Sequence, residues 1–469
     1  MKKKNLLIFM TDGHRADCLG CGGNAILKTP NVDRMAREGV LCSRSFSAHT
    51  VCMPARASVF TGRYPHVHGV WANGIPLPRD EVTLAEVLAG NGYRTCAAGK
   101  VHFEPQQAPD FPPVLKPEES YYGFQEVSFN ENRQGADYLR FVAAHFPGLL
   151  ETARRRGRLP EEAHELTWVT DRAIAFVERQ AGQDAPFFAF CSFHELSPPC
   201  HPPEGFDNLY APEDMPPPKV REGELDGKPP YHRACYEAYR AKGRHPDAET
   251  LRRYLASYYN QTTFLDKQFG RLLDALRRLD VLDETVVLFT SDHGLVLNDH
   301  WLWRHGPFMY DQVIRVPMIW YMPGAPTAGC AADDLVESVD VMPTVLDLLG
   351  IDPPAGVQGR SVAPLLLGEA GATGRDSVLV QDRESPELLA RDIDPTGFQI
   401  KTLRTAAWKL VHYPERPYGE LYDLTNDPDE FDNLWADAGY LERRREMEGL
   451  LMDRLCRTED PLPERDYQW

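Results

Sequence analysis

The sequence has no hydrophobic run long enough to cross a membrane. The apolar stretch nearest the start, residues 5–10, ends at Thr11 and Asp12, whereas a membrane-spanning helix needs roughly 20 apolar residues. No small-residue cleavage site follows this stretch, so a secretory signal peptide is a poor interpretation. A first β-strand fits better, and we expect the protein to be cytoplasmic.

The sequence also lacks a disulfide framework and an excess of positive charge. Its ten cysteines are scattered without a repeated spacing, which indicates mostly reduced thiols. Lysine and arginine number 51 against 69 aspartates and glutamates, giving a formal charge of -18. Such a surface repels nucleic acid and anionic membranes. We therefore expect neither as a partner, and a site for an anionic substrate must be locally positive.

There is no internal repeat, and strands alternate with helices along most of the chain. This alternation predicts an α/β fold, a sheet covered by helices on both faces. Continuous apolar runs such as residues 5–10 are typical of buried parallel strands. The predicted strands are residues 5–10, 93–100, 186–194, 285–292 and 316–323, and the predicted helices are 29–39, 83–92, 166–180, 249–282 and 338–350.

The pattern changes near residue 370. Short strands are predicted at 377–382, 398–413 and 419–424, followed by a helix at 440–455. A chain of 469 residues is longer than a single hydrophobic core usually supports. We therefore expect a catalytic domain at 1–369 and a small antiparallel-sheet domain at 370–469. Residues 105–165 and 200–246 look irregular, and loops of this length are usually lids or insertions.

Polar side chains follow several of the predicted strands. Ligands of open α/β sheets bind beyond the carboxyl ends of the strands, so these side chains should converge on one rim. A single histidine in such a place is usually a satisfied hydrogen-bonding group, but a set at four strand ends is harder to attribute to chance. The set comprises Asp12, Lys100, His102, His194, Asp292 and His293.

Asp12, Asp292 and His293 indicate a divalent-cation site. Two carboxylates suit a hard cation such as Ca²⁺, and an imidazole also admits Mn²⁺ or Mg²⁺. The alternative is that the two aspartates merely cap the helices that follow them. Lys100 and His102 would point to the same side of an extended segment. A cation and an imidazole placed together suit an oxyanion and a proton transfer.

Residues 52–63, "CMPARASVFTGR", place Cys52, Pro54 and Arg56 at a tight spacing that a structural cysteine does not need. The segment resembles the signature of the type I, formylglycine-dependent sulfatases, and the resemblance extends over nearly the whole chain. The other matching motifs are "TDGHRADCLGCGG", "TPNVDRMAREGV", "GKVHF", "SDHG", "GPFMYDQVIRVPMIWY" and "GELYDLTNDPDEFDNL".

The resemblance implies an alkaline-phosphatase-like α/β/α sandwich. Such a fold has a large mixed, mostly parallel sheet and a small C-terminal α+β domain with an antiparallel sheet. It also implies that a formylglycine-generating enzyme oxidises Cys52 to formylglycine. One hydroxyl of the hydrated aldehyde attacks sulfur and displaces the alcohol, and the second then drives the release of sulfate.

The same resemblance assigns roles to single residues. Asp12, Asp292, His293 and the modified Cys52 would bind one divalent metal, with Ca²⁺ expected before Mn²⁺ or Mg²⁺. Arg56 would hold the formylglycine hydroxyl. The residues that would contact the sulfate, position it or assist proton transfer are Lys100, His102, His201, Asn73, His194 and His305.

Two positions depart from the family pattern. Gly13 stands where many members have a second aspartate, so the metal should have one carboxylate fewer. His305, in "LWRHGPF", stands where lysine is common. A histidine can bind sulfate when it is protonated, but its charge would depend on pH near neutrality.

We therefore expect hydrolysis of a small sulfate ester. One alternative is a phosphonate monoester or phosphodiester hydrolase that uses the same site. Another is a catalytically silent binding protein in which Cys52 is never oxidised. Choline sulfate, an aryl sulfate and a sulfated sugar all remain open as substrates, as does assembly into a homo-oligomer.

Overall fold

The computed structural model describes residues 3–105, 116, 119–131, 136–197, 200–241, 247–383 and 399–460. Parts of the segments predicted to be irregular, 105–165 and 200–246, lie outside the described residues. So do residues 384–398 and 461–469 of the predicted C-terminal domain.

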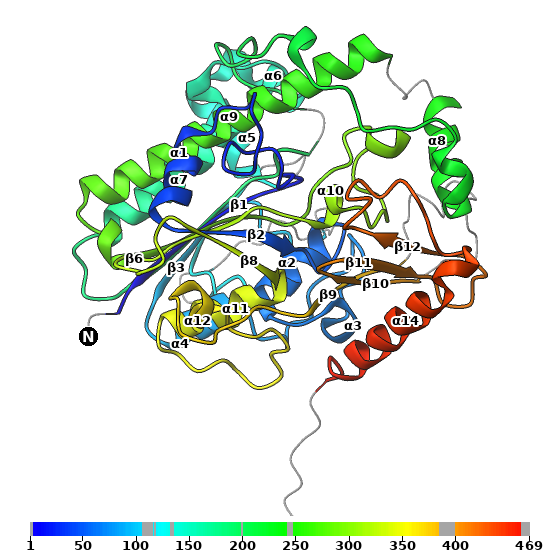
Figure 1. Cartoon of the computed structure of the whole chain (residues 1–469). Helices are drawn as coiled ribbons and strands as arrows, with labels where there is room; N and C mark the ends of the chain where they lie inside the picture. The colour runs from blue at the N-terminus through cyan, green and yellow to red at the C-terminus, as the bar shows by residue number, and fades with distance from the viewer. Residues whose placement is uncertain are drawn as a thin grey trace, which may run out of the picture.

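A large eight-stranded sheet crosses the molecule (Figure 1), in the order β4-β3-β5-β1-β6-β7-β2-β8. Strand β7 is antiparallel to both of its neighbours, and every other pair is parallel. The predicted mixed, mostly parallel sheet is thus confirmed. Its strands are β1 (Asn5–Thr11), β2 (Val40–Phe46), β3 (Arg94–Gly99), β4 (Glu126–Phe129), β5 (Phe187–Ser192), β6 (Thr285–Ser291), β7 (Met318–Tyr321) and β8 (Cys330–Glu337).

Helices cover both faces of this sheet, as the alternating pattern predicted. Helices α1 (Pro30–Glu38), α7 (Glu165–Gln180) and α9 (Ala248–Arg278) pack on one face. Helices α2 (Cys52–Thr61), α4 (Leu84–Gly90), α11 (Val341–Leu348) and α12 (Ala363–Leu366) pack on the other. The other α-helices among the described residues are α3 (Pro65–His68), α5 (Ala136–His145), α6 (Leu150–Arg154), α8 (Pro230–Ala241), α10 (Asp311–Ile314) and α14 (Leu441–Cys456).

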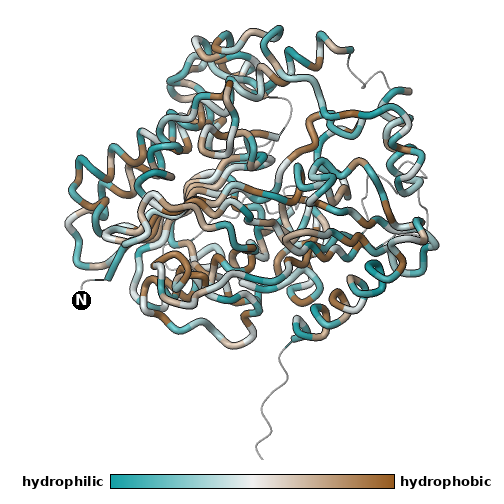
Figure 2. Tube along the Cα trace, in the orientation of Figure 1, coloured by the Kyte–Doolittle hydropathy of each residue, from teal (hydrophilic) through white to brown (hydrophobic). Residues whose placement is uncertain are grey.

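Strand β1 shows why a central strand reads as an unbroken apolar run. Its successive side chains point to opposite faces, and both faces are covered. Leu7 and Phe9 belong to one core, and Ile8 and Met10 belong to the other. Figure 2 shows the strands of this sheet in white to brown where they run side by side through the middle of the molecule.

A separate four-stranded antiparallel sheet follows, in the order β12-β11-β10-β9, and helix α14 packs against it. The single strand predicted at 398–413 is wrong, because the segment forms two strands joined by a tight turn. The Thr405 hydroxyl closes this turn by accepting from the Trp408 N–H at 3.0 Å. The strands are β9 (Ser377–Arg383), β10 (Gln399–Thr405), β11 (Trp408–His412) and β12 (Gly419–Asp423).

The two segments predicted to be irregular contain regular structure. Helices α5 and α6 lie in the first, with the short strand β4, and helix α8 lies in the second. The prediction failed because both segments are rich in proline, glycine and charged residues, which lie between these helices. Such residues are typical of loops and masked the helical pattern. Strands β2 and β8 and helix α2 were also not predicted.

Helix α2, which carries Cys52, is held against α3 by a buried histidine. Val70 N–H donates to His68 Nδ1 at 3.1 Å, and Nε2 lies 3.0 Å from the hydroxyl of Ser58 on α2. Because Nδ1 accepts, the neutral ring with its proton on Nε2 fits these partners. Burial, with smaller effects from neighbouring His49 and Arg63, lowers the pKa of His68 to about 3.

We predict that this histidine makes the protein acid-sensitive. Its stabilising contribution is full above pH ~6.5, the pKa of an unfolded histidine, and is lost as pH falls toward 3. The loss between pH 6.5 and 5 should be about 2 kcal/mol in the free energy of unfolding. Denaturant unfolding of wild type and His68→Gln at both pH values measures it. If the free energy of unfolding changes equally with pH in the two proteins, the prediction is contradicted.

Candidate active site

The two aspartates lie side by side at the carboxyl ends of adjacent strands. Strands β1 and β6 are parallel and pair Thr11 with Ser291, so Asp12 and Asp292 each follow a paired position. Both side chains are fully buried. Asp292 accepts from the His293 N–H at 2.9 Å and from the Gly13 N–H at 3.3 Å.

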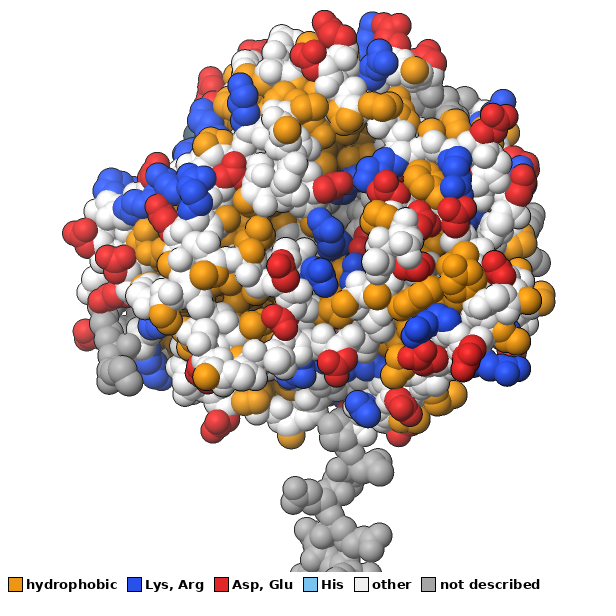
Figure 3. Space-filling model, in the orientation of Figure 1, with side chains coloured by type: hydrophobic (Ala, Val, Ile, Leu, Met, Phe, Trp, Pro, Cys, Tyr) orange, Lys and Arg blue, Asp and Glu red, His pale blue; other side chains and the backbone are white. Residues whose placement is uncertain are grey.

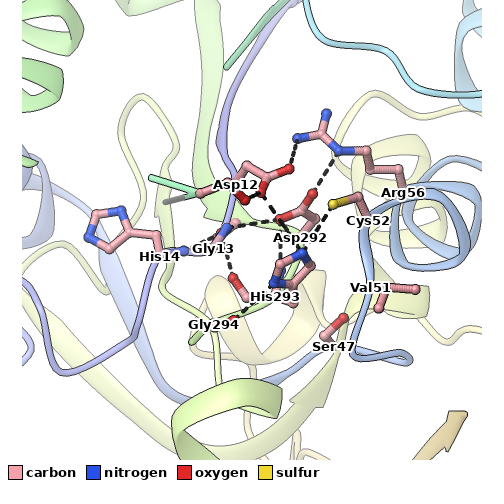
Figure 4. A network of polar contacts seen from close by, with 12 residues as sticks. Asp12, Gly13, His14, Ser47, Val51, Cys52, Arg56, Asp292, His293 and Gly294 are labelled. Atoms are coloured by element: carbon pink, nitrogen blue, oxygen red, sulfur yellow. Dashed lines mark hydrogen bonds and ion pairs between the residues drawn. The ribbon is translucent and has the colours of Figure 1, made fainter. Parts of the chain in front are cut away.

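Cys52 is the first residue of helix α2, and it faces this aspartate pair. Figure 4 shows its sulfur directed at the ring of His293, 3.2 Å from Nε2. One potential ligand atom from each of Asp12, Cys52, Asp292 and His293 lies within 4.8 Å of the others. A helix N-terminus carries partial positive charge and unpaired N–H groups, so the group at Cys52 sits where negative charge is stabilised.

These four residues fit a divalent cation by the chemistry of their donors. Burial would lower the pKa of His293, but Asp292, Cys52 and Asp12 raise it to about 10. The imidazolium therefore holds positive charge among the carboxylates, 3.8 Å from Asp292 and 3.9 Å from Asp12. A metal would take over this role after displacing the proton, as metal binding to histidine requires.

Arg56 lies one helical turn after Cys52, so both residues share a face of α2. Its guanidinium is fully buried and pairs with Asp292 at 2.7 Å and with Asp12 at 3.6 Å. The other N–H groups donate to the Lys100 carbonyl at 2.7 Å, the Ser192 hydroxyl at 2.8 Å and the Phe193 carbonyl at 3.2 Å. These bonds fix Asp292 relative to α2, which explains the spacing between Cys52 and Arg56.

Lys100 directly follows β3, and its ammonium bonds Asp12 at 2.5 Å in a fully buried pair. Burial would raise the pKa of Asp12, but Lys100, His293 and Arg56 hold it well below its usual range. The second Asp12 oxygen accepts from the Ser197 hydroxyl at 2.5 Å. Asp12 is thus a fixed anion.

His102 does not continue an extended segment, so the geometric reason for placing it beside Lys100 was wrong. Its φ is 60°, in the left-handed region, which is uncommon for residues other than glycine. Glu131 holds this turn by accepting from the N–H groups of Val101 and His102, each at 2.9 Å. Among the described residues, no hydrogen bond reaches His102 Nδ1. Burial and the charge of Lys100 lower its pKa well below the usual range.

The two histidines after β5 lie in different surroundings. His194 is buried 3.2 Å from Glu165 and 3.3 Å from Glu195, and it contacts Arg156. Burial and Arg156 lower its pKa to about 3. His201 is partly exposed, and its carbonyl accepts from His164. Within the described part of the chain, no hydrogen bond or ion pair joins His201 to Asp12, Cys52, Asp292 or His293.

Asn73 and His305 lie close to the cluster. The Asn73 carbonyl oxygen accepts from the Met53 N–H at 2.9 Å, so it caps α2 beside Cys52 from another loop. The His305 ring centre lies 4.7 Å from that of His293. Burial and the positive His293 lower the pKa of His305 well below its usual range. The sequence suggested that the charge of His305 would depend on pH near neutrality, whereas these surroundings favour the neutral ring there.

Several residues of the site carried no recognisable sequence signal. Arg156 lies in a basic run that resembles a solvated surface, yet it contacts His194. Glu131 and Ser197 belong to no motif, and they hold His102 and Asp12. His49 is buried three residues before Cys52, and its Nδ1 accepts from the Val51 N–H at 3.2 Å.

Within the described ranges, no helix combines the length and apolar character needed to cross a bilayer. Acidic and basic side chains are interspersed over the face of the molecule in Figure 3.

Comparisons with known proteins agree with this geometry. An arylsulfatase of Clostridium perfringens is 30% identical over 472 residues, covering 94% of this chain and 92% of the relative. An N-acetylglucosamine-6-O-sulfatase of Bacteroides thetaiotaomicron is 26% identical, covering 99% and 88%. The crystal structure of a phosphonate monoester hydrolase of Agrobacterium radiobacter superposes with a TM-score of 0.83 at 25% identity, covering 99% and 100%.

Two family patterns match the chain. The pattern described as N-sulphoglucosamine sulphohydrolase, C-terminal, matches residues 299–456. The pattern described as Sulfatase matches residues 4–351, which include every member of the Asp12, Cys52, Asp292 and His293 cluster. The chain therefore belongs to the sulfatase family, within the alkaline phosphatase superfamily.

Proposed function

We propose that this protein is a metal-dependent sulfatase that hydrolyses a small sulfate ester with a formylglycine made from Cys52. The observation that carries the proposal is the buried set of Asp12, Cys52, Asp292 and His293, with Cys52 at a helix N-terminus. Family membership supports sulfuric ester hydrolysis as the reaction.

The chain's own groups are arranged to bind an anion and organise a nucleophile. Asp12, Asp292, His293 and residue 52 would hold one divalent cation, for which we propose Ca²⁺ before Mn²⁺ or Mg²⁺. When bound, the cation would act as a Lewis acid on the sulfate and lower the pKa of the nucleophilic hydroxyl. The formylglycine hydrate would supply that hydroxyl and a second one for the release of sulfate.

The remaining residues would position the sulfate and move protons. Lys100 and Arg56 pair with Asp12 and Asp292 and bring positive charge to the rim of the sheet. We propose that the unpartnered nitrogen of neutral His102 exchanges a proton with the reacting oxygens. His194, His201 and His305 are proposed to contact the sulfate or the leaving oxygen, and Asn73 to hold the start of α2 beside residue 52.

Hydrolysis of phosphonate monoesters or phosphodiesters is the second candidate. It is supported by the similarity to the phosphonate monoester hydrolase over nearly all of both chains. The two reactions need the same nucleophile, cation and anion-binding groups. In each, a tetrahedral sulfur or phosphorus centre that carries anionic oxygens is transferred to the nucleophile at residue 52. The cluster around Cys52 suits both.

A substrate panel tests the proposal. The protein should be co-expressed with a formylglycine-generating enzyme and assayed on aryl sulfates, choline sulfate, hexosamine sulfates, phenyl phosphonates and phosphodiesters. We expect at least one sulfate ester to be turned over with a higher kcat/KM than any phosphorus ester. A reversed order would favour the second candidate.

Mass spectrometry of the peptide 45–56 tests whether residue 52 is modified. Conversion replaces the CH₂SH group with an aldehyde, lowers the mass and removes the site of thiol alkylation. A fully alkylatable Cys52 in protein that still hydrolyses sulfate esters would overturn the formylglycine proposal. An unmodified, inactive protein would point to a binding role.

A further inference from the structure

A small cavity of about 170 Å³ opens beside the segment that leads to Cys52. Strand β9 runs along this segment, because the Gln381 N–H donates to the Ala48 carbonyl at 3.0 Å and Asp382 bonds the hydroxyl of Thr50. The lining residues used here are His49, His66, Trp71, Asp382, Arg383 and Lys401.

Two of the lining residues carry positive charge that no carboxylate neutralises among the described residues. Lys401 bonds only the neutral Gln381 amide, at 3.1 Å, and Arg383 lies 5.5 Å from the centre of the Trp71 ring. Burial and Arg383 lower the pKa of Lys401 to about 8. Two cations that no described carboxylate pairs with stand out on a chain whose formal charge is -18.

The cavity also exposes an unsatisfied hydrogen-bonding group. His49 is 1% exposed, and its Nε2 has no hydrogen bond of good geometry among the described residues, although a weaker contact with the Trp71 backbone partly opposes the lowering of its pKa by burial. The one acid in the lining, Asp382, lies 4.0 Å from that atom. Burial raises the pKa of Asp382 to about 7, so near neutral pH its charge is incomplete and opposes a bound anion only in part.

Two lining residues of the cavity, His49 and Trp71, lie close in sequence to residues that hold the start of α2. His49 lies three residues before Cys52 and bonds the Val51 N–H. Trp71 lies two residues before Asn73, which caps the helix of Cys52. His49 and Trp71 therefore place the cavity against the two segments that hold residue 52.

We propose that this cavity receives part of the alcohol portion of the substrate and selects sulfate esters that carry a second oxyanion, a carboxylate or another sulfate. The inference rests on the proposed function and narrows its substrate class. Arg383 and Lys401 would pair with the oxyanion, since guanidinium and ammonium groups bond such oxygens strongly. The Trp71 ring would contact the carbon skeleton. The volume suits one substituent rather than a whole sugar.

The kinetic test compares phenyl sulfate, 3-carboxyphenyl sulfate and the disulfate of 1,3-dihydroxybenzene. We expect wild type to favour the two dianions by about tenfold or more in kcat/KM, mainly through KM, and to lose preference as salt screens the charges. Arg383→Gln and Lys401→Gln should each reduce the preference, and Arg383→Glu should abolish or reverse it. The preference is the ratio of kcat/KM for each dianion to that for phenyl sulfate, so a loss shared by all three esters does not count as support.

The matched control is Arg445→Gln, which removes an exposed positive charge from α14 instead. It should leave the preference unchanged. Equal kcat/KM for all three esters, or an equal loss in the Arg445 and Arg383 variants, would overturn the subsite. The ratio of kcat/KM for 3-carboxyphenyl sulfate to kcat/KM for the disulfate shows whether a carboxylate or a sulfate fits the cavity better.

A binding measurement separates this inference from the proposed function. Calorimetric titration of 3-hydroxybenzoate into Cys52→Ala protein should show binding that Arg383→Glu weakens by about tenfold or more, whereas phenol should not bind. If no sulfate ester is hydrolysed but this binding is found, the proposed function fails and the subsite stands. If sulfate esters are hydrolysed but this binding is absent, the subsite fails alone.

Discussion

Replacing Cys52 with alanine is expected to lower kcat/KM by roughly 10⁴-fold or more, the order of loss that follows removal of a covalent nucleophile. The reason is positional. Cys52 is the group at the N-terminus of α2 that faces His293 and the aspartate pair, and among the described residues it is the one thiol of that cluster. Initial rates on the best sulfate ester of the panel measure the effect.

The matched control for this variant is Cys42→Ala. Cys42 is also buried, but it belongs to the core beneath the sheet and not to the cluster. Cys42→Ala should keep activity near wild type while costing some stability through the lost packing. Circular dichroism and thermal unfolding should show Cys52→Ala to be folded. A Cys52→Ala rate near that of wild type would exclude the covalent mechanism.

Removing the metal is expected to have the second largest effect. Chelation should lower the rate by at least about a hundredfold. Mutating a residue that only supports a metal ligand already costs about 10–100-fold in metal affinity or activity, and losing the metal itself should cost more. Ca²⁺, Mn²⁺ and Mg²⁺, added back separately, should restore activity to different degrees. Asp292→Asn should require a much higher metal concentration, since it neutralises a proposed ligand that also pairs with Arg56.

Stability gives a readout of metal binding that does not depend on turnover. Metal at a hundredfold excess over Kd should add about 2.7 kcal/mol to the free energy of unfolding. Asp292→Asn should lose most of this gain. Asp266→Asn is the control, because Asp266 is a buried aspartate that holds Asn31 and Val32 at the start of α1. A fully demetallated protein with an unchanged rate and melting temperature would refute the metal assignment.

The sequence by itself determined the parts of the fold and site that depend on local pattern. Continuous apolar runs marked β1 and β6, because both faces of these strands are buried. Ligands of open α/β sheets bind beyond the carboxyl ends of the strands, so Asp12 and Asp292 could be assigned to one rim because each follows a predicted strand. The spacing of Cys52, Pro54 and Arg56, which a structural cysteine does not need, also marked this segment in the sequence.

Tertiary structure alone decided the elements and contacts that no local pattern encodes. Every residue of α2 is buried, so the helix has no amphipathic period by which it could be predicted. The bond from Arg56 to Asp292 joins residues 236 positions apart, and the cavity at Arg383 depends on β9 lying beside residues 48–50. Such contacts are set by how the cores pack.

The histidines show the same division most clearly. Sequence proposed His102, His194, His201 and His305 as a group, because each follows a strand or a motif. Packing separates them, since His305 lies against His293, His194 lies between two glutamates and an arginine, and His201 is partly exposed. Residue type and spacing fixed which side chains could do the chemistry. Burial and neighbouring charges set the pKa of each histidine, and both exist only in the folded chain.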